Sequence, residues 1–205
     1  SKRVTNGSTW PKANCRFPRL RNKVASLTDL LNDLIGGNET RAEAAVPLLI
    51  ELGEEAIPAL LDLTRSADVD HRWWGLRVLA QSPHSQAGWL APFLNDPARE
   101  VRQCAALGLA LKPDESAIRP LVQALSDEDS MVASLAVNAL VKIGSAAVPA
   151  LIAVVQEASQ SARIHALRAL AEIRDQRAIP IMMKVMDEKS VLLQHWATEG
   201  LERLG

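Results

Sequence analysis

The residues that most often carry out chemistry in proteins are scattered along this sequence. Its four histidines stand far apart: His71, His84, His165 and His195. Neither they nor the two cysteines, Cys15 and Cys104, have the spacing of a zinc site or of a disulfide framework. No glycine-rich phosphate loop of the Walker or dinucleotide type is present. We therefore expect no catalytic residue, no metal site and no cofactor site.

Carboxylates are plentiful, with 24 Asp and Glu in 205 residues. They gather in short acidic segments such as residues 126–130, which are typical of solvated turns. A serine, a histidine and an acid can be chosen from any chain of this length, and nothing in the sequence brings three of them together. The pattern of acids thus favours turns and helix ends over a catalytic pair.

Any functional group must be positioned by a unit that recurs every 30 or 31 residues. One column of this unit is always leucine: Leu49, Leu79, Leu109, Leu140, Leu170 and Leu201. Four residues earlier, every residue is small: Ala45, Gly75, Ala105, Ala136, Ala166 and Ala197. At the joints between units the residue is always alanine: Ala56, Ala87, Ala117, Ala147 and Ala178. Three columns in phase indicate a repeat protein.

Residues 118–147 show what one unit contains. A first short helix has apolar residues at spacings of three, four and seven: Ile118, Leu121, Val122 and Leu125. After the acidic turn, a second helix has an apolar stripe of its own: Val132, Ala136, Ala139, Leu140 and Ile143. It ends at Gly144, which can adopt the left-handed conformation of a helix end. Because neither helix can bury its apolar face alone, the units must stack.

Several segments resemble the short HEAT-like repeat first described in phycobilisome lyase subunits. Residues 96–109 (DPAREVRQCAALGL) and 178–182 (AIPIM) are similar to it, and its Ile/Val-Pro-Ala-Leu opening recurs at residues 57–61 and 148–152. The resemblance covers about residues 27–205. It implies an all-α fold, a right-handed α-solenoid of about six short helix–turn–helix repeats, with the second helices along the concave face.

We expect the chain to have two parts. A basic, irregular leader occupies residues 1–23, and a HEAT-like repeat domain occupies residues 24–205. The expected repeats are residues 24–56, 57–87, 88–117, 118–147, 148–178 and 179–205. Residues 1–27 hold seven Lys or Arg and no acid, whereas the remainder carries a net charge of −8. The array is therefore acidic and its leader basic.

The register of the repeat places ten residues on the concave face, where we expect a partner to bind. They are Trp73, Gln103, Ser134, Ile164 and His195 and, one helical turn further on, Arg77, Leu107, Asn138, Arg168 and Glu199. The column beside them should be half buried: Trp74, Cys104, Leu135, His165 and Trp196. Because consecutive helical residues point in different directions, we expect one tryptophan of the Trp73–Trp74 pair to be exposed. Gly75 follows them as though the indoles needed room.

The surplus of tryptophan and arginine on this face favours protein recognition, since both are common anchors of interfaces. Our main interpretation is a non-catalytic interaction module or scaffold that binds a protein or peptide on its concave face, and not an enzyme. The last repeat ends at Gly205 without a polar capping helix, which predicts that a partner, further chain or a second copy covers that end.

Two alternatives stay open. The resemblance implies a subunit of a phycobilin lyase-type factor, which attaches or detaches a linear tetrapyrrole at a cysteine of a phycobiliprotein, usually with a paired subunit. In that case Trp73, Arg77, His165 and Arg168 would contact the pigment. The other alternative is a HEAT-like nucleic-acid-binding protein, which needs a basic inner groove. Arg72, Arg77, Arg163 and Arg168 could form a basic stripe, but the acidic array argues against nucleic acid.

The composition places the chain among soluble globular proteins, with 48% apolar and 23% charged residues. No apolar run as long as the ~20 residues of a membrane span stands out, and the first residues lack the apolar core of a signal peptide. We expect a cytoplasmic protein that does not enter a membrane.

Overall fold

Twelve α-helices and five short 3₁₀ segments make up residues 25–205, the part of the chain that the computed structural model describes, and no β-strand occurs there. The predicted leader lies outside these residues, as does Cys15. The helices pair into six helix–turn–helix repeats: α1 (Leu27–Ile35) with α2 (Glu39–Glu51), α3 (Ile57–Leu63) with α4 (Val69–Gln81), α5 (Ala87–Leu90) and η2 (Ala91–Asn95) with α6 (Arg99–Leu111), α7 (Ile118–Ala124) with α8 (Ser130–Ile143), α9 (Val148–Glu157) with α10 (Gln160–Ile173), and α11 (Ile179–Met186) with α12 (Val191–Leu204). We number these pairs repeats 1 to 6.

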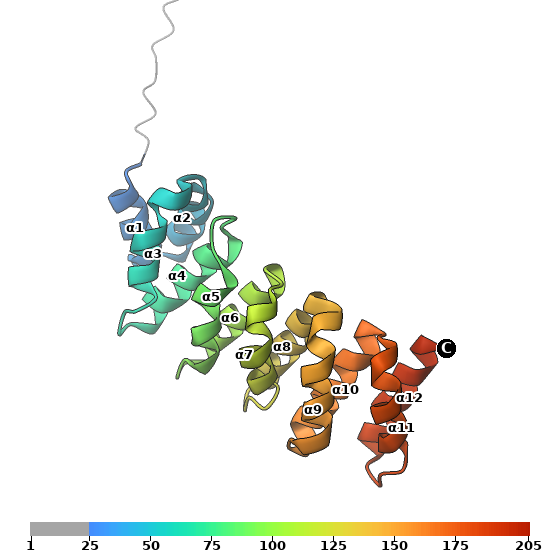
Figure 1. Ribbon diagram of the computed structural model, residues 1–205. Coiled ribbons are helices and arrows are strands. Elements are labelled where there is room, and N and C mark those ends of the chain that lie inside the picture. Colours follow the sequence, from blue (N-terminus) through green and yellow to red (C-terminus); the bar gives the residue numbers. More distant parts are fainter. Residues whose placement is uncertain (1–24) are drawn as a thin grey trace, which may run out of the picture.

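The repeats follow one another along a single axis, so that α1 and α12 lie at opposite ends of the array (Figure 1). Successive repeats are joined by the remaining 3₁₀ segments, η1 (Gly53–Glu55), η3 (Glu115–Ala117), η4 (Gly144–Ala147) and η5 (Gln176–Ala178), and by a loop after α4. The predicted all-α, right-handed solenoid of about six HEAT-like repeats is confirmed.

The conserved spacing of leucine and alanine has a direct packing reason. Five members of the leucine column are at most 1% exposed, and Leu201 in the last repeat is half buried because no further repeat covers it in the structure. The small column and the joint alanines are buried as well. Gly75 needs its missing side chain because a Cβ there would lie 3.0 Å from the carbonyl oxygen of Leu60 and 3.1 Å from the Cβ of Leu63, both in α3. The expectation that the indoles require this glycine is therefore wrong.

The starts and ends of the second helices follow from local sequence. Asp68 and Asp129 cap α4 and α8, each by accepting backbone N–H groups of the first turn. Gly144 ends α8 with a φ of 77°, as expected of a residue that no side chain hinders. Arg174 adopts a left-handed φ of 58° at the end of α10, in the column of Gly144.

One stretch, Ser130–Glu157, is long and apolar enough by composition to cross a membrane, although we expected no such run. The structure resolves it into two helices, α8 and α9, which Gly144 and η4 separate. Leu140 in α8 and Leu151 in α9 are fully buried against neighbouring helices. This stretch is therefore the apolar centre of the array.

Candidate functional site

A groove with a volume of about 500 Å³ runs along the second helices α4, α6 and α8. Its lining is mainly apolar: Trp73, Arg77, Ala80, Gln81, Glu100, Gln103, Cys104, Leu107, Leu111, Met131 and Leu135. Leu107, Leu111 and Met131 are each about half exposed, which is unusual for large apolar side chains. We call this surface the inner groove. Its volume lies within the range of roughly 300–1,000 Å³ that is typical of small-molecule sites.

The inner groove contains some of the ten residues predicted to bind a partner. Trp73, Arg77, Gln103 and Leu107 line it, and Asn138 lines a smaller depression that shares Leu107 with it. The other five do not line the groove: Ser134, Ile164, Arg168, His195 and Glu199. The structure thus brings together residues from repeats 2 to 4, and a partner-binding role for all ten stays a prediction.

Trp73 and Arg77 line one end of the inner groove, and Trp74 lies directly beside them on α4. Both indoles are half buried, so the expectation that one of them is exposed is wrong. Their rings meet edge to face with centroids 4.8 Å apart, and the Arg77 guanidinium lies 5.2 Å and 5.8 Å from the two rings. Such a cation–π arrangement fixes the orientation of both partners. One α4 surface therefore holds two rings and a cation in a defined geometry.

A carboxylate on the preceding repeat holds Arg77 in place. Its Nη2 donates to both oxygens of Glu43 on α2, at 2.8 Å and 2.9 Å. Its Nε is buried and finds no hydrogen-bond acceptor among the described residues. A buried donor without an acceptor is costly, so the contacts of Arg77 with Glu43 and the two indoles must offset this loss.

Cys104 forms part of the groove wall but has no reactive thiolate. Burial raises the pKa of its thiol to about 12, so the sulfur stays protonated at neutral pH. Its Sγ donates a weak hydrogen bond to the Trp73 carbonyl oxygen over 4.0 Å. Because thiolates are the nucleophilic form, Cys104 contributes packing and not covalent chemistry.

Two histidines that we considered for pigment or partner contact lie outside the groove. His165 Nδ1–H donates to the carbonyl oxygen of Leu125 at the end of α7 over 3.0 Å. His195 is exposed on α12 and meets Trp196 edge to face, with centroids 5.3 Å apart. Within residues 25–205, no group of three His, Cys, Asp or Glu side chains could hold a metal ion.

A column of arginines, which the repeat pattern did not predict as functional, joins successive repeats. Arg72 donates to both carboxylate oxygens of Asp96 in the next repeat, at 2.8 Å and 2.9 Å, and to the carbonyl oxygens of Ser66 and Ala67. In the same column, Arg163 forms an ion pair with Glu188 in the next repeat. We call such contacts inter-repeat ion pairs.

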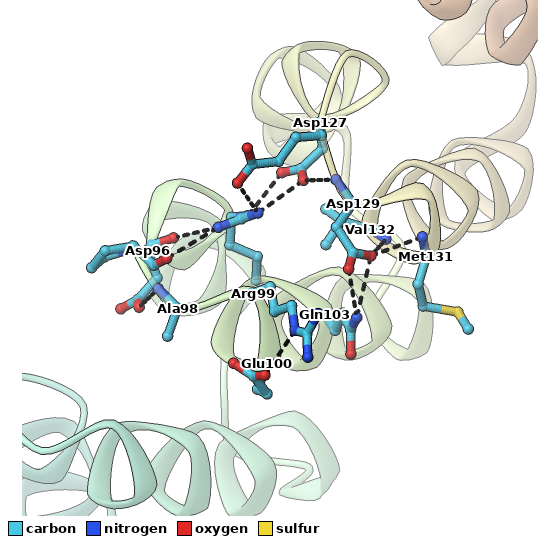
Figure 2. Close-up of polar contacts among 12 residues, drawn as sticks. Asp96, Ala98, Arg99, Glu100, Gln103, Asp127, Asp129, Met131 and Val132 are labelled. Carbon is cyan, nitrogen blue, oxygen red and sulfur yellow. Dashed lines mark hydrogen bonds and ion pairs between the residues drawn. The ribbon is translucent and has the colours of Figure 1, made fainter.

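Arg102 makes the most extensive of these contacts, between α6 and the turn before α8. It donates to Asp127 at 2.8 Å and 3.0 Å, to Glu128 at 3.2 Å and to the carbonyl oxygen of Asp96 at 3.1 Å. Asp96 and Asp127 are labelled in Figure 2, and an oxygen of each accepts a hydrogen bond from Arg102. The signal that would have revealed the column is an arginine followed 24 or 25 residues later by an acid, in three repeats.

The four arginines of the proposed basic stripe are all neutralised by acids. Each forms an ion pair, Arg72 with Asp96, Arg77 with Glu43, Arg163 with Glu188 and Arg168 with Glu172. A nucleic-acid groove needs cations that are free to contact phosphates. The structure therefore gives no support to the nucleic-acid alternative.

Comparison with known families agrees with the repeat pattern. The family model for HEAT repeats matches residues 87–160, and the model for the PBS lyase HEAT-like repeat matches residues 162–188. Residues 87–188 thus carry HEAT-type repeats, and those at 162–188 are of the PBS lyase type.

Curated relatives of this HEAT-like repeat protein come from cyanobacteria. It is 35% identical over 75 residues to phycocyanobilin lyase subunit beta of Nostoc sp., which is 37% of this chain and 38% of that protein. It is 34% identical over 105 residues to the phycobilisome maturation protein of Synechococcus elongatus, 51% of this chain and 50% of that protein. The chain thus spans half or less of the length of these relatives.

Solved structures of the same fold include two from bacteria. The complex of CpcE and CpcF of phycocyanin lyase from Nostoc sp. matches 98% of this chain and 82% of the compared chain, with a TM-score of 0.51 and 18% identity. YibA of Escherichia coli matches 96% of this chain and 80% of its own, with a TM-score of 0.57 and 18% identity. These likenesses show the solenoid fold.

The relatives overturn our main functional interpretation. We expected a non-catalytic interaction module and no enzyme, but the relatives of this HEAT-like repeat protein are a lyase subunit, a phycobilisome maturation protein and a bilin biosynthesis protein. Both expectations are wrong. The repeat pattern could not predict the function, because helical repeats bury the same columns whatever their exposed faces bind.

Proposed function

We propose that this chain is a subunit of a factor that attaches a linear tetrapyrrole to a protein cysteine, or removes it, as in phycobilin lyases. The observation that carries the proposal is the similarity to phycocyanobilin lyase subunit beta and the phycobilisome maturation protein. It supports a role in handling the chromophore, and the inner groove offers room for a ligand.

The inner groove suits a long, mostly apolar molecule with a few polar groups. Leu107, Leu111 and Met131 offer apolar surface for ring edges, and Trp73 offers an aromatic face. The Arg77 side chain lines the groove and places a cation near a carbonyl or carboxylate oxygen of the ligand. Since Glu43 already neutralises Arg77, we expect apolar contact to contribute more to affinity than ionic attraction.

The chain itself supplies no covalent acceptor in this groove. The Cys104 thiol, with its pKa raised to about 12, stays protonated, and Glu100, the one carboxylate among the residues that line the groove, is paired with Arg99. We therefore propose that the groove binds and orients the tetrapyrrole, while the reacting cysteine belongs to a protein partner. A phycobiliprotein and a second repeat subunit are the proposed partners, in a soluble, cytoplasmic setting.

The proposal is tested with phycocyanobilin and two matched variants. Leu107→Arg places a charge on the apolar wall of the groove, whereas Leu192→Arg makes the same change on α12, outside it. Both leucines are more or less equally exposed, at 50% and 56%, so neither change should disturb the core. We expect the wild-type chain and Leu192→Arg to shift the bilin absorption to longer wavelength. We expect Leu107→Arg to bind roughly tenfold more weakly, which corresponds to about 1.4 kcal/mol.

A second variant removes the aromatic and cationic end of the groove. Trp73→Ala combined with Arg77→Ala should abolish the shifted band while far-ultraviolet circular dichroism stays helical. Loss of helicity in this variant would show that both residues are structural. The comparison of Leu107→Arg with Leu192→Arg would then be the test of bilin binding in the groove. Absence of a band shift in the wild type, together with no bilin transfer to an apo-phycobiliprotein in the presence of a second subunit, would contradict the proposed function.

A further inference from the structure

A second depression adjoins the inner groove on the face of the second helices. It has a volume of about 290 Å³ and shares two wall residues, Leu107 and Leu135, with the groove. Its other lining residues include Asn138 and Lys142 on α8 and Glu172 on α10. We call it the Lys142 depression. Because the two cavities have walls in common, one ligand can extend from the groove into the depression.

One side of α8 leads from the apolar groove to this lysine. Met131 and Leu135 line the groove, whereas Asn138 and Lys142 line the depression. The four residues are spaced by four, three and four positions, so they follow one side of the helix. Along this side the residues change from apolar to amide to cation. Polarity therefore increases from the groove toward Lys142.

Lys142 differs from the arginines of this face because no acid within residues 25–205 neutralises it. Arg77 is paired with Glu43, and Arg168 with Glu172. The Lys142 side chain is exposed, and its ammonium group forms no ion pair or hydrogen bond with the described residues. Glu172 lies in the same depression, but the Nε of Arg168 donates to it over 3.1 Å. Lys142 thus leaves the depression with an excess positive charge.

The opposite end of the inner groove has the reverse charge. A third depression, of about 270 Å³, shares Trp73 with the groove and is lined by residues that include Glu39 and Asp70. Neither of these carboxylates forms an ion pair with another described residue. A carboxylate of a ligand would be repelled at this end and attracted at Lys142. The groove therefore has an acidic end and a basic end.

We propose that the Lys142 depression is a subsite for the carboxylate groups of the ligand that the inner groove binds. Lys142 supplies the ionic contact, and the side-chain amide of Asn138 supplies a hydrogen-bond donor. A linear tetrapyrrole combines apolar ring edges with carboxylate side chains, so its rings lie against Leu107 and Leu135 while a carboxylate reaches Lys142. This assignment rests on the proposed function and gives the bound tetrapyrrole an orientation.

Lys142 also lies in the last turn of α8, where a cation stabilises the end of a helix. Lys184 occupies the same kind of position, in the last turn of α11, and is exposed as well. It lines neither the inner groove nor the Lys142 depression. Lys184 is therefore a matched control, because it has the same role at a helix end without the adjoining cavity.

The test compares phycocyanobilin with its dimethyl ester, in which both carboxylates are neutralised, by absorbance titration of the full chain. We expect the wild-type chain to bind the free acid about fivefold more tightly than the ester, as for one exposed ion pair. Lys142→Gln should abolish this preference by weakening the binding of the free acid alone, whereas Lys142→Arg and Lys184→Gln should keep it. The preference should also decrease at high salt, which screens exposed charges.

The outcomes separate the subsite from the proposed function. Equal binding of acid and ester by the wild-type chain would overturn the subsite and leave tetrapyrrole binding in place. A Lys142→Gln variant that binds both forms more weakly would also overturn it, because Lys142 would then be structural. Loss of the preference in Lys184→Gln would mean that no particular lysine is responsible. Binding of neither form by the wild-type chain would contradict the proposed function and the subsite with it.

A further variant tests the orientation. Glu39→Gln with Asp70→Asn removes charge from the acidic end of the groove and leaves Lys142 in place. We expect the preference for the free acid to stay nearly unchanged, because the carboxylates lie at the other end. A large gain in free-acid binding, combined with no effect of Lys142→Gln, would place the carboxylates beside Glu39 and Asp70 and overturn the assignment.

Discussion

Repeats 2 to 4 and repeats 5 to 6 share their buried columns but present different surfaces. In both regions the leucine and alanine columns lie in the core. On the second helices, repeats 2 to 4 expose Leu107, Leu111 and Met131 around a groove, whereas in repeats 5 and 6 the columns of Leu107 and Leu111 include Arg168, Glu172 and Glu199. The comparison shows that the repeat pattern determines the core, and that binding capacity depends on columns which the pattern leaves free to vary.

The two regions also differ in how deeply their inter-repeat ion pairs are buried. The side chains of Arg72 and Arg102 are 11% and 9% exposed, whereas that of Arg163 is 19% exposed and its partner Glu188 is 35% exposed. A buried charge that loses its partner is far more costly than an exposed one. The first region should therefore depend more strongly on its ion pairs than the second.

The largest effect should follow the loss of the most buried arginine. Arg102→Ala leaves Asp127 without its counter-charge, and we expect the free energy of unfolding to fall by about 3–5 kcal/mol. Urea denaturation followed by circular dichroism measures this change. The control is Arg99→Ala, on the same helix, whose exposed pair with Glu100 should contribute no measurable stability. Equal effects of the two variants would contradict the role of burial.

A second prediction compares the middle and the end of the leucine column. Leu140 is fully buried between repeats, so Leu140→Ala should lower the free energy of unfolding by about 2–5 kcal/mol. Leu201→Ala, at a half-buried position, should cost clearly less because fewer contacts are lost. The same denaturation experiment measures both changes. A larger loss for Leu201→Ala would mean that another surface covers the last repeat in solution.

The smallest expected effect is the loss of two helix caps at low pH. Bonds from the backbone N–H groups of His71 and Val132 lower the pKa of Asp68 and Asp129, the caps of α4 and α8, below the ordinary value of 3.8. A carboxylate whose pKa is lower in the folded state stabilises it above the unfolded pKa, and this stabilisation is lost as the pH falls through the folded pKa. The cap of α10 is Ser159, which does not titrate.

Amide hydrogen exchange between about pH 5 and pH 2 can separate these helices. We expect the first turns of α4 and α8 to lose protection as the pH falls, once intrinsic exchange rates are taken into account, and the first turn of α10 to keep it. Asp129→Ser should remove the pH dependence from α8 alone. A similar loss of protection at low pH in α10 would show that acid destabilises the whole array and not only the two helices that Asp68 and Asp129 cap.

Some of this structure could be predicted from residues alone because the repeats reinforce one another. Leu140 is one of six leucines in a column, and Gly144 is one of several helix-ending residues in another, so that both assignments rest on several copies of the same pattern. Trp73 and Arg77 were placed on the groove face by the same register. The fold and part of the candidate site are in this sense local properties of the sequence.

Tertiary structure determined what no single column could reveal. The edge-to-face arrangement of Trp73 and Trp74 beside Arg77 is completed by Glu43 from the preceding repeat, and the extent of the groove depends on three helices from three repeats. The inter-repeat ion pairs join residues 24 or 25 positions apart that only stacking brings within hydrogen-bond distance. The sequence by itself determined the helices, their buried faces and their order, because these follow from local periodicity. Which exposed side chains meet depends on the distance between repeats, which only the packed structure sets.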